Sequence, residues 1–250
     1  MISVFNPFSL EGKSILVTGA SSGIGRGVAI TCSKLGAKVV INGRNLQKLR
    51  ETLLLMEGDC HQISAGDITN KMTLLSLVGK LPILDGVVHC AGVGQRIPCK
   101  MLSEDNINQV MDINFKAPVL LQSELLRQKK LSKGSSVVFI SSIASWSPSY
   151  ANSVYSASKG AIASYANCLA LELAPQKIRV NCISPAMVWT DLIKADGVDE
   201  EILKEDEKKY PLKRYGTPED VANLAVYMLS DASQWMTGSN VNITGGGRLS

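Results

Sequence analysis

The sequence has few of the side chains that bind metals or build disulfide frameworks. Its 250 residues include only two histidines, and its six cysteines form no C-x-x-C pair. Zinc sites are built from clusters of cysteine and histidine, so a metal site is not expected. Scattered cysteines are typical of reduced thiols and argue against a disulfide-stapled secreted protein. We expect the chemistry to come from oxygen and nitrogen groups or from an organic cofactor.

Long apolar runs and a strong net charge are also missing. No apolar stretch approaches the roughly 20 residues that a membrane helix needs. The opening residues, MISVFNPFSLEGK, have neither the basic start nor the small-residue cleavage site of a signal peptide. The formal charge of +4 comes from scattered lysines and arginines. We therefore expect a cytoplasmic protein that binds neither membranes nor nucleic acid.

Short β-branched segments alternate along the chain with longer segments of helical pattern. Strands are predicted at residues 14–19, 37–43, 61–67, 86–92, 135–142, 178–185 and 240–246. Most of these segments are apolar through the middle, which is typical of parallel strands covered by helices on both faces. The pattern predicts one α/β domain over residues 1–250, a three-layer sandwich with a seven-stranded parallel sheet.

Residues 187–215 break this rhythm. The segment is highly charged, has apolar residues at helical spacing and directly follows the sixth predicted strand. We interpret it as a substrate lid over the carboxyl edge of the sheet. A solvated surface helix is the alternative interpretation.

A glycine-rich turn, TGASSGIGRG, follows the first predicted strand and opens a helical segment. Glycine permits a sharp turn and a close approach of pyrophosphate, and the N–H groups that begin the helix point at the anion. This context is that of a dinucleotide-binding site. The predicted cofactor contacts in this turn are Gly19, Ser21, Ser22, Gly23, Ile24 and Gly25.

The end of the second predicted strand indicates which dinucleotide binds. An acidic residue there would accept hydrogen bonds from the ribose of NAD, but this chain has INGRN. Arg44 supplies a cation and Ser21 a hydroxyl donor for a 2′-phosphate, which favours NADP(H). An ordinary surface arginine is the alternative. Asp67 and Ile68, after the third predicted strand, are candidates for the adenine edge, although Asp67 is equally suited to cap the helix that begins near Asn70.

Tyr155 and Lys159 lie four residues apart in SVYSASKGA, a helical segment of small side chains. Residues at this spacing are neighbours on a helix, and an ammonium favours a nearby phenolate. Because a tyrosine with its ordinary pKa of about 10 is a poor acid–base catalyst at neutral pH, the pair indicates catalysis. Ser142, at the end of the fifth predicted strand, is placed to stabilise an oxyanion. Asn114 is a candidate to hold a water against Lys159.

Together these motifs resemble the short-chain dehydrogenase/reductase family. The similarity extends through RVNCISP at 179–185, YPLKRYGTPEDVA at 210–222 and TGSNVNITGG at 237–246. It implies a Rossmann-type fold, a nicotinamide cofactor and a homotetramer or homodimer. It also implies a catalytic tetrad of Asn114, Ser142, Tyr155 and Lys159. Further cofactor contacts are expected from Cys90, Tyr155, Lys159, Val188 and Thr190.

The chain departs from the family pattern after the fourth and sixth predicted strands. His89 and Cys90 stand where the family usually has two asparagines, and Ala186 stands where it has glycine. The hydrogen bonds of those two asparagine amides must therefore be replaced or lost. Neither change removes a member of the tetrad.

The resemblance implies that the chain reduces a ketone to a secondary alcohol with NADPH, and that Tyr155 protonates the alkoxide. The chain is similar to 3-oxoacyl-carrier-protein reductases, and Lys133 and Lys177 are candidates for a basic rim that receives an acidic carrier. A free sugar, polyol or other small alcohol is the alternative substrate. A non-catalytic NADP-binding sensor is the alternative function, which a broken tetrad would indicate. Residues expected to line the substrate pocket are Gln95, Arg96, Trp146, Tyr150 and Trp189.

Overall fold

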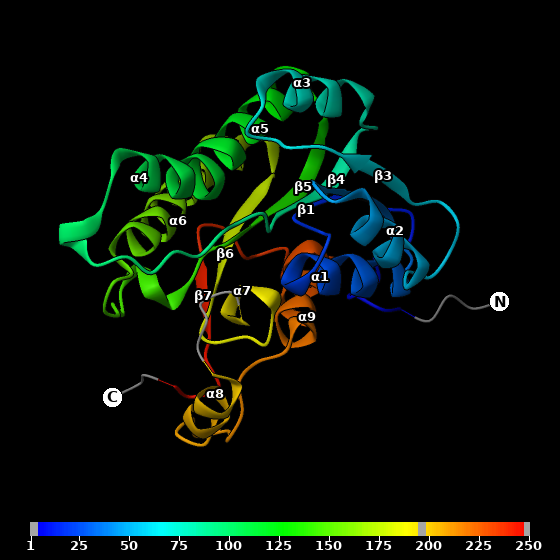
Figure 1. Ribbon diagram of the computed structural model, residues 1–250. Coiled ribbons are helices and arrows are strands. Elements are labelled where there is room, and N and C mark those ends of the chain that lie inside the picture. The colour runs from blue at the N-terminus through cyan, green and yellow to red at the C-terminus, as the bar shows by residue number, and fades with distance from the viewer. Residues whose placement is uncertain (1–4, 195–198, 248–250) are drawn as a thin grey trace.

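Seven parallel strands form one sheet at the centre of the protein (Figure 1). The computed structural model describes residues 5–194 and 199–247, and within them the strands follow the order β3-β2-β1-β4-β5-β6-β7. The sequence prediction of a Rossmann-type α/β fold with a seven-stranded parallel sheet is confirmed. The strands are β1 (Ser14–Thr18), β2 (Lys38–Gly43), β3 (Gln62–Ala65), β4 (Leu84–His89), β5 (Leu131–Ile140), β6 (Arg179–Pro185) and β7 (Asn240–Ile243).

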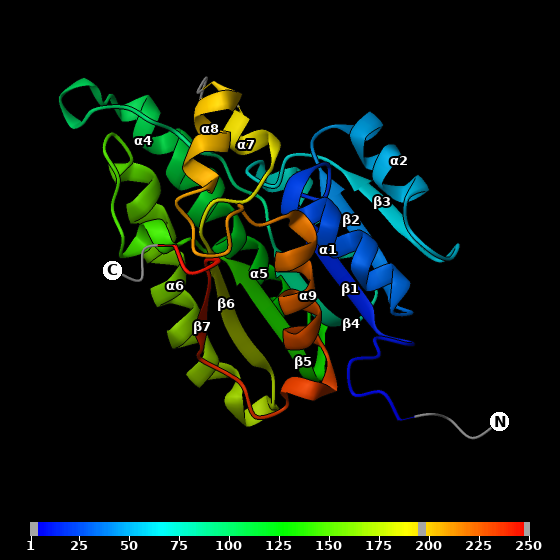
Figure 2. The ribbon, with the colours of Figure 1, turned by 90° about the horizontal axis from the view of Figure 1, so that it is seen from below.

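Helices cover both faces of the sheet, with α1 and α9 side by side on one face and α3, α5 and α6 on the other (Figures 1 and 2). None of the helices in the described part of the chain is long and apolar enough to cross a membrane. The helices are α1 (Gly23–Lys34), α2 (Leu46–Leu54), α3 (Lys71–Lys80), α4 (Glu104–Met111), α5 (Ala117–Arg127), α6 (Ser153–Leu173), α7 (Asp191–Lys194), α8 (Glu200–Glu207) and α9 (Pro218–Leu229).

Alternating side chains of the central strands divide the core into two layers. Ile15 and Val17 of β1 pack on the α1 and α9 side, while Leu16 between them packs on the other side with α3 and α5. In β5, Val138 packs on the α1 and α9 side and Val137 packs on the opposite side. Successive side chains of a strand point to opposite faces, so a continuously apolar strand buries both. The apolar runs that predicted the strands are thus explained by two covered faces.

The fourth strand ends earlier than the sequence predicts. β4 stops at His89, not at residue 92, because the chain then turns toward β1. The backbone N–H groups of Cys90 and Ala91 both donate to the Thr18 hydroxyl, at 3.2 and 3.3 Å. This bend places Cys90 and Gly92 at the carboxyl edge, where they border the site described below.

The strand order reverses between β1 and β4, and there the two backbones meet. A Cβ atom on Gly19 would lie 2.7 Å from the Ala91 nitrogen, and the φ angle of Gly19 is +67°. Both features restrict this position to glycine. Ligands of open α/β sheets bind at such a switch point, outside the carboxyl ends of the strands. The fold therefore predicts the site at the ends of β1 and β4.

His89 replaces one of the expected asparagines and is 4% exposed. Its ring stacks on Phe139 of β5 with centroids 4.5 Å apart. Its Nε2 and the Gln122 side-chain oxygen of α5 lie 3.1 Å apart. Among the described residues, neither His89 Nδ1 nor Gln122 Nε2 has a hydrogen-bond partner. The lost asparagine bonds are therefore replaced only in part.

His89 should make the stability of the protein depend on pH. Burial lowers the pKa of His89 to about 4, although the Gln122 hydrogen bond acts in the opposite direction. An unfolded chain takes up that proton below its ordinary histidine pKa of about 6.5. The free energy of unfolding should therefore fall as the pH drops from about 6.5 toward 4, by up to about 1.4 kcal/mol per pH unit, and this contribution should level off below that range. Urea unfolding at several pH values measures it.

The His89→Asn variant isolates this effect because His61 is present in both proteins. The difference between the two unfolding curves should have the predicted slope between pH 4 and 6.5. Parallel curves over that interval would contradict the prediction.

Candidate active site

A groove runs along the carboxyl ends of β1, β2, β3 and β4. The structure places most of the predicted cofactor residues in its wall, and the sequence missed Asn42, Gly66, Gly92 and Val93, which line it too. Asn42 and Gly66 lie near the carboxyl ends of predicted strands, so their positions in the sequence could have indicated that they line the groove. The predicted residues that line the groove are Gly19, Ser21, Ser22, Gly23, Ile24, Gly25, Arg44, Asp67, Ile68, Cys90 and Thr190.

The first turn of α1 faces this groove, and in the described part of the chain no side chain occupies the free N–H groups of that turn. Ser22 occupies the N-cap position, but its side chain makes no capping hydrogen bond, and the first turn has no acidic residue. The orphan N–H groups of a helix start are an anion site. A Cβ on Gly25 would lie 2.3 Å from the Gly19 oxygen, so glycine lets the helix approach the turn. These features fit a pyrophosphate.

The far end of the groove fits a 2′-phosphate. A Cβ on Gly43 would lie 2.2 Å from the Ser21 hydroxyl, so this hydroxyl lies directly over the end of β2, next to Arg44. Arg44 and Ser21 both line the groove. A guanidinium and a hydroxyl together suit a phosphate, as the sequence predicted.

The sequence left two roles open for Asp67, a cofactor contact and a cap for the following helix, and the structure gives the cap to Asn70. Asp67 lines the groove, and its carboxylate accepts hydrogen bonds from the Thr69 nitrogen and hydroxyl at 2.9 and 2.7 Å. The side chain of Asn70, not that of Asp67, caps α3 by accepting from the Thr73 nitrogen at 3.0 Å. Asp67 therefore stabilises the turn that borders the groove.

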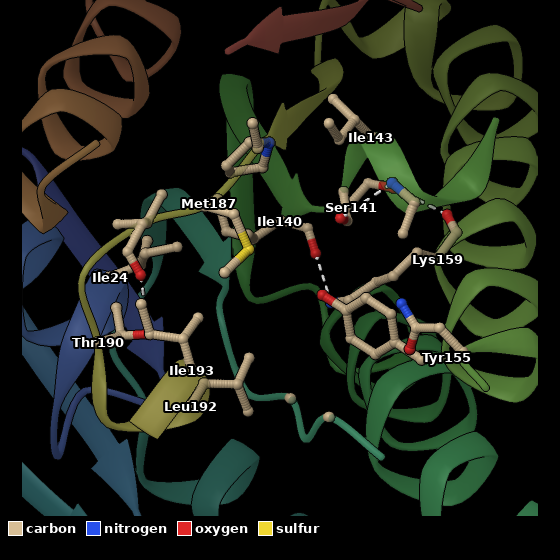
Figure 3. Close-up of a pocket in the computed structure, with 18 of the residues that line it drawn as sticks. Ile24, Ile140, Ser141, Ile143, Tyr155, Lys159, Met187, Thr190, Leu192 and Ile193 are labelled. Carbon is tan, nitrogen blue, oxygen red and sulfur yellow. Dashed lines mark hydrogen bonds between the residues drawn. The ribbon is translucent and has the colours of Figure 1, made fainter. Parts of the chain in front are cut away.

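A second cavity of about 200 Å³ adjoins the groove, and Ser142, Tyr155 and Lys159 line it. Tyr155 and Lys159 extend into it from α6, across from Thr190 and Leu192 (Figure 3). Val188 lines this cavity but not the groove. The residues that border both spaces are Ile24, Cys90, Gly92, Val93, Thr190 and Leu192.

Lys159 carries a buried amino group, with 6% of the residue exposed. Its Nζ donates to the Ile140 carbonyl at 2.9 Å and lies 5.7 Å from the centre of the Tyr155 ring. Burial lowers the pKa of Lys159 to about 8, while Cys90 and Cys182 act in the opposite direction. The pKa of each of these two thiols is raised to about 12, mainly by burial, so both stay neutral. The charge on Lys159 is therefore available to stabilise a phenolate at Tyr155.

Ser142 lines the cavity and carries a hydroxyl that can donate a hydrogen bond. It follows β5 at the start of a short 3₁₀ turn, and its Oγ accepts a hydrogen bond from the Ala144 nitrogen at 3.1 Å. A hydroxyl can donate one bond while it accepts another. This geometry suits donation to a carbonyl oxygen of a substrate.

Asn114 lies behind the cavity wall, within a π-helical turn (Asp112–Lys116) between α4 and α5. Its Oδ1 accepts from the Val93 nitrogen at 2.8 Å, and its Nδ2 donates to the Val93 oxygen and the Ser158 hydroxyl, both at 3.0 Å. Ser158 in turn donates to the Tyr155 carbonyl at 2.7 Å. Both amide hydrogens are thus used by protein groups. The side chain of Asn114 therefore positions Val93 and Ser158, and its role in holding a water against Lys159 stays a prediction.

The predicted lid, residues 187–215, contains α7 and α8, and its residues 195–198 lie outside the described part of the chain. α8 is tied to the segment after it, because the Tyr215 hydroxyl donates to Asp206 at 2.7 Å and the Tyr215 nitrogen donates to Glu207 at 2.9 Å. The indole N–H of Trp189 also donates to Glu207. Asp206 and Glu207 therefore link α8 to Trp189 and Tyr215 of the same segment.

The sequence assigned the wall of the substrate cavity only in part. Gln95 and Arg96 line it, as predicted, whereas Trp146, Tyr150 and Trp189 do not. Trp189 packs on Tyr215 within the lid, with ring centroids 5.3 Å apart. Trp146 and Tyr150 are 50% and 83% exposed, which is too open for side chains that close a cavity. Apolar lid residues, Leu192 and Ile193, take the place expected for the aromatic residues (Figure 3).

Lys133 and Lys177 lie at the wrong edge of the sheet for a carrier-docking rim. Lys133 is near the start of β5, and Lys177 comes just before β6. All the strands run parallel, so both lysines are at the amino edge while the cavities are at the carboxyl edge. The prediction that they border the active site is wrong.

Comparison with known proteins decides the family. A family model described as enoyl-(acyl carrier protein) reductase matches residues 19–247. A curated relative, the 3-oxoacyl-[acyl-carrier-protein] reductase of Rickettsia felis, is 32% identical over 237 residues, which cover 95% of this chain and 97% of the relative. The chain belongs to the short-chain dehydrogenase/reductase family.

Solved structures of similar proteins identify the cofactor. A putative NAD(P)-dependent gluconate 5-dehydrogenase from Beutenbergia cavernae with bound NADP has a TM-score of 0.87 and 29% identity, covering 96% of this chain and 98% of that chain. A putative 2-deoxy-D-gluconate 3-dehydrogenase from Agrobacterium tumefaciens with bound NADP has a TM-score of 0.85 and 32% identity, covering 97% and 98%. With the groove described above, they confirm that the chain is an NADP-dependent enzyme of this family.

Replacing Arg44 with aspartate should change the cofactor preference. The carboxylate repels a 2′-phosphate and accepts hydrogen bonds from a ribose diol. We expect the ratio of kcat/KM with NADPH to that with NADH to fall by at least about 10-fold, the effect of losing one charged hydrogen bond. Arg50→Asp, an exposed change on α2 outside the groove, is the matched control. An equal change in both variants would show that only net charge matters.

An ion pair joins the two sides of the cofactor groove. Lys48 Nζ on α2 lies 3.2 Å from Asp191 Oδ2 on α7, and Asp191 lines the groove. Exposed pairs of this kind contribute about 0.2–1 kcal/mol. Lys48→Gln or Asp191→Asn should therefore speed NADPH release up to about fivefold in stopped-flow fluorescence.

The charge-swapped double variant, Lys48→Asp with Asp191→Lys, should restore most of the slow release. NADH should respond as NADPH does, because the pair does not involve the 2′-phosphate. An effect of Lys48→Gln on NADPH alone would instead assign Lys48 to the phosphate.

Proposed function

We propose that the protein reduces a ketone to a secondary alcohol, with Asn114, Ser142, Tyr155 and Lys159 in the roles that the family resemblance implies. The observation that carries the proposal is the shared cavity, in which Ser142, Tyr155 and Lys159 adjoin the cofactor groove. NADPH bound in that groove supplies the hydride. The sensor alternative is disfavoured because no tetrad position is altered.

In the proposed reaction the hydroxyls of Ser142 and Tyr155 bind the carbonyl oxygen. Hydrogen bonds aimed at this atom stabilise the negative charge that develops on it. Tyr155 then donates its proton to the oxygen, and Lys159 stabilises the resulting phenolate. Asn114 bonds Val93 directly, and through Ser158 it holds the first turns of α6 in place.

The cavity favours a small free ketone over an acyl chain on a carrier protein. Its volume of about 200 Å³ is below the roughly 300–1,000 Å³ of sites that enclose drug-sized ligands. The two lysines expected to receive a carrier lie at the opposite edge of the sheet. The sugar-acid dehydrogenase names of the similar structures agree with a small substrate.

A 3-oxoacyl thioester on a carrier protein is the second candidate substrate. The name and 32% identity of the Rickettsia relative favour it. A homodimer or homotetramer and a cytoplasmic location stay predictions from the resemblance and from the composition.

The Tyr155→Phe variant tests the reaction, because it removes the proton donor and keeps the ring. We expect kcat to fall by about 100-fold or more, the usual contribution of an acid–base group, with little change in NADPH affinity. The measurement is NADPH oxidation at saturating cofactor with free ketoses, ketohexonates, simple diketones and 3-oxoacyl thioesters. Substantial turnover by the variant, or tight NADPH binding with no turnover by the unaltered protein, would overturn the proposal.

A further inference from the structure

Arg26 joins the glycine turn to helix α2, which lies beside α1 (Figures 1 and 2). Its Nη2 donates to the Ser21 carbonyl at 2.7 Å and lies 3.2 Å from Glu51 Oε2. Its Nε donates to the Thr52 hydroxyl at 3.0 Å. Arg26 is not among the described residues that line the cofactor groove. Its guanidinium therefore binds the turn from outside the groove.

Thr52 of α2 provides a second connection to the same turn. It is fully buried, and its Oγ1 lies 2.9 Å from the Ala20 carbonyl and 3.0 Å from the Lys48 carbonyl. A hydroxyl has one hydrogen to donate, so these two carbonyls share it. Because the same oxygen accepts from Arg26 Nε, the two side chains form one hydrogen-bonded network. We call this pair the Arg26–Thr52 link.

The glycine turn is also bonded to the end of β2. The Ala20 nitrogen donates to the Asn42 carbonyl at 3.0 Å. Arg44 follows two residues later, and the next residue, Asn45, caps α2 with its side chain. The strand before Arg44 and the helix after it are therefore both bonded to the turn that carries Ser21.

The 2′-phosphate of NADPH is the part of the cofactor that requires this arrangement. Arg44 and Ser21, the side chains that suit it, come from the two segments that the Arg26–Thr52 link joins. Charged hydrogen bonds to a phosphate depend on distance and angle, and groups that are fixed before binding lose less entropy when the ligand arrives. NADH carries a hydroxyl in place of the 2′-phosphate. A displaced turn should therefore weaken NADPH binding more than NADH binding.

We propose that Arg26 and Thr52 are positioning residues for recognition of the 2′-phosphate. Arg26 acts through the Ser21 carbonyl and Thr52 through the Ala20 carbonyl. Together they fix the Ser21 hydroxyl relative to Arg44, and so they set the preference of the chain for NADPH. Neither residue touches the cofactor groove in the described part of the chain. This role is exercised in cofactor binding and is independent of the ketone reduction proposed above.

Cofactor binding tests this role. The dissociation constants of NADPH and NADH are measured by fluorescence titration of the unaltered protein and of Arg26→Met, which keeps an apolar stem and removes the guanidinium. We expect the NADPH constant to rise about 10-fold, the effect of losing one charged hydrogen bond, and the NADH constant to change less than about twofold. Thr52→Val should raise the NADPH constant about threefold, as expected for a neutral hydrogen bond, and Thr52→Ser should keep the NADPH constant of the unaltered protein.

Three further variants separate geometry from charge. Arg50→Met removes an exposed arginine of α2 outside the groove and should leave both constants unchanged. Arg26→Met combined with Glu51→Gln keeps the net charge of the protein and should retain the loss of NADPH affinity. In an Arg44→Gln background, Arg26→Met should have a smaller effect on NADPH, since residues that act on the same group are not additive.

The outcomes distinguish this role from a general effect on the fold. A loss that is confined to NADPH and is reduced in the Arg44→Gln background supports it. Equal losses for both cofactors, unchanged NADPH binding by Arg26→Met, full additivity with Arg44→Gln, or recovery on adding Glu51→Gln overturns it. None of these measurements uses a ketone, so the proposed reaction is tested separately by the turnover of Tyr155→Phe.

Discussion

The close contact between the ends of β1 and β4 is the constraint on which both cavities depend. Gly19 comes so near Ala91 that a Cβ would overlap the backbone. Thr18 then bonds the nitrogens of Cys90 and Ala91, so β4 ends there and the chain bends outward. The groove forms where the glycine turn leaves β1, and the catalytic cavity forms where residues 92–97 leave β4. A larger residue at position 19 would separate the strands and disturb both spaces together.

The buried charge of Lys159 is the second determinant of the site. An ammonium away from water is unfavourable unless polar groups surround it. Here the Ile140 carbonyl and the Tyr155 ring face it, and the two neighbouring thiols stay protonated because burial raises the pKa of each to about 12. A carboxylate in this position would neutralise the lysine and reduce its effect on the tyrosine. Cysteine at position 90 is neutral, as the asparagine that the family usually has there is, so the exchange adds no charge beside Lys159.

Sequence patterns revealed the features that depend on local spacing. The strands follow from apolar runs, the cofactor groove from a glycine turn after a strand, and the Tyr155–Lys159 pair from one helical turn. Contacts between distant segments were not predictable in this way. The π-helical turn at Asn114 has no periodic signature in the sequence. Ser158 is one of many small residues in its helix, and the sequence gives no sign that it links Asn114 to the Tyr155 carbonyl.

Other errors arose because burial depends on partners that a single segment does not reveal. Trp189 is held inside the lid segment, away from the cavity, because Glu207, eighteen residues later, accepts its indole N–H. By contrast, the location of Lys133 and Lys177 was accessible from the sequence, since both come at the start of a predicted strand and the site lies at the strand ends.

Asn114 connects the loop after β4 to the start of α6, the two segments that carry the proposed substrate and proton-transfer residues. Its amide holds Val93, which begins the loop of Gln95 and Arg96, and through Ser158 it also supports the turn of α6 that carries Tyr155. A shift of the loop would therefore move Tyr155, the proposed proton donor, and a shift of the helix would move the loop that borders the cavity. Because three hydrogen bonds from one buried amide join them, neither side adjusts alone. The position of Tyr155 and the position of the loop at the cavity wall thus depend on the same side chain.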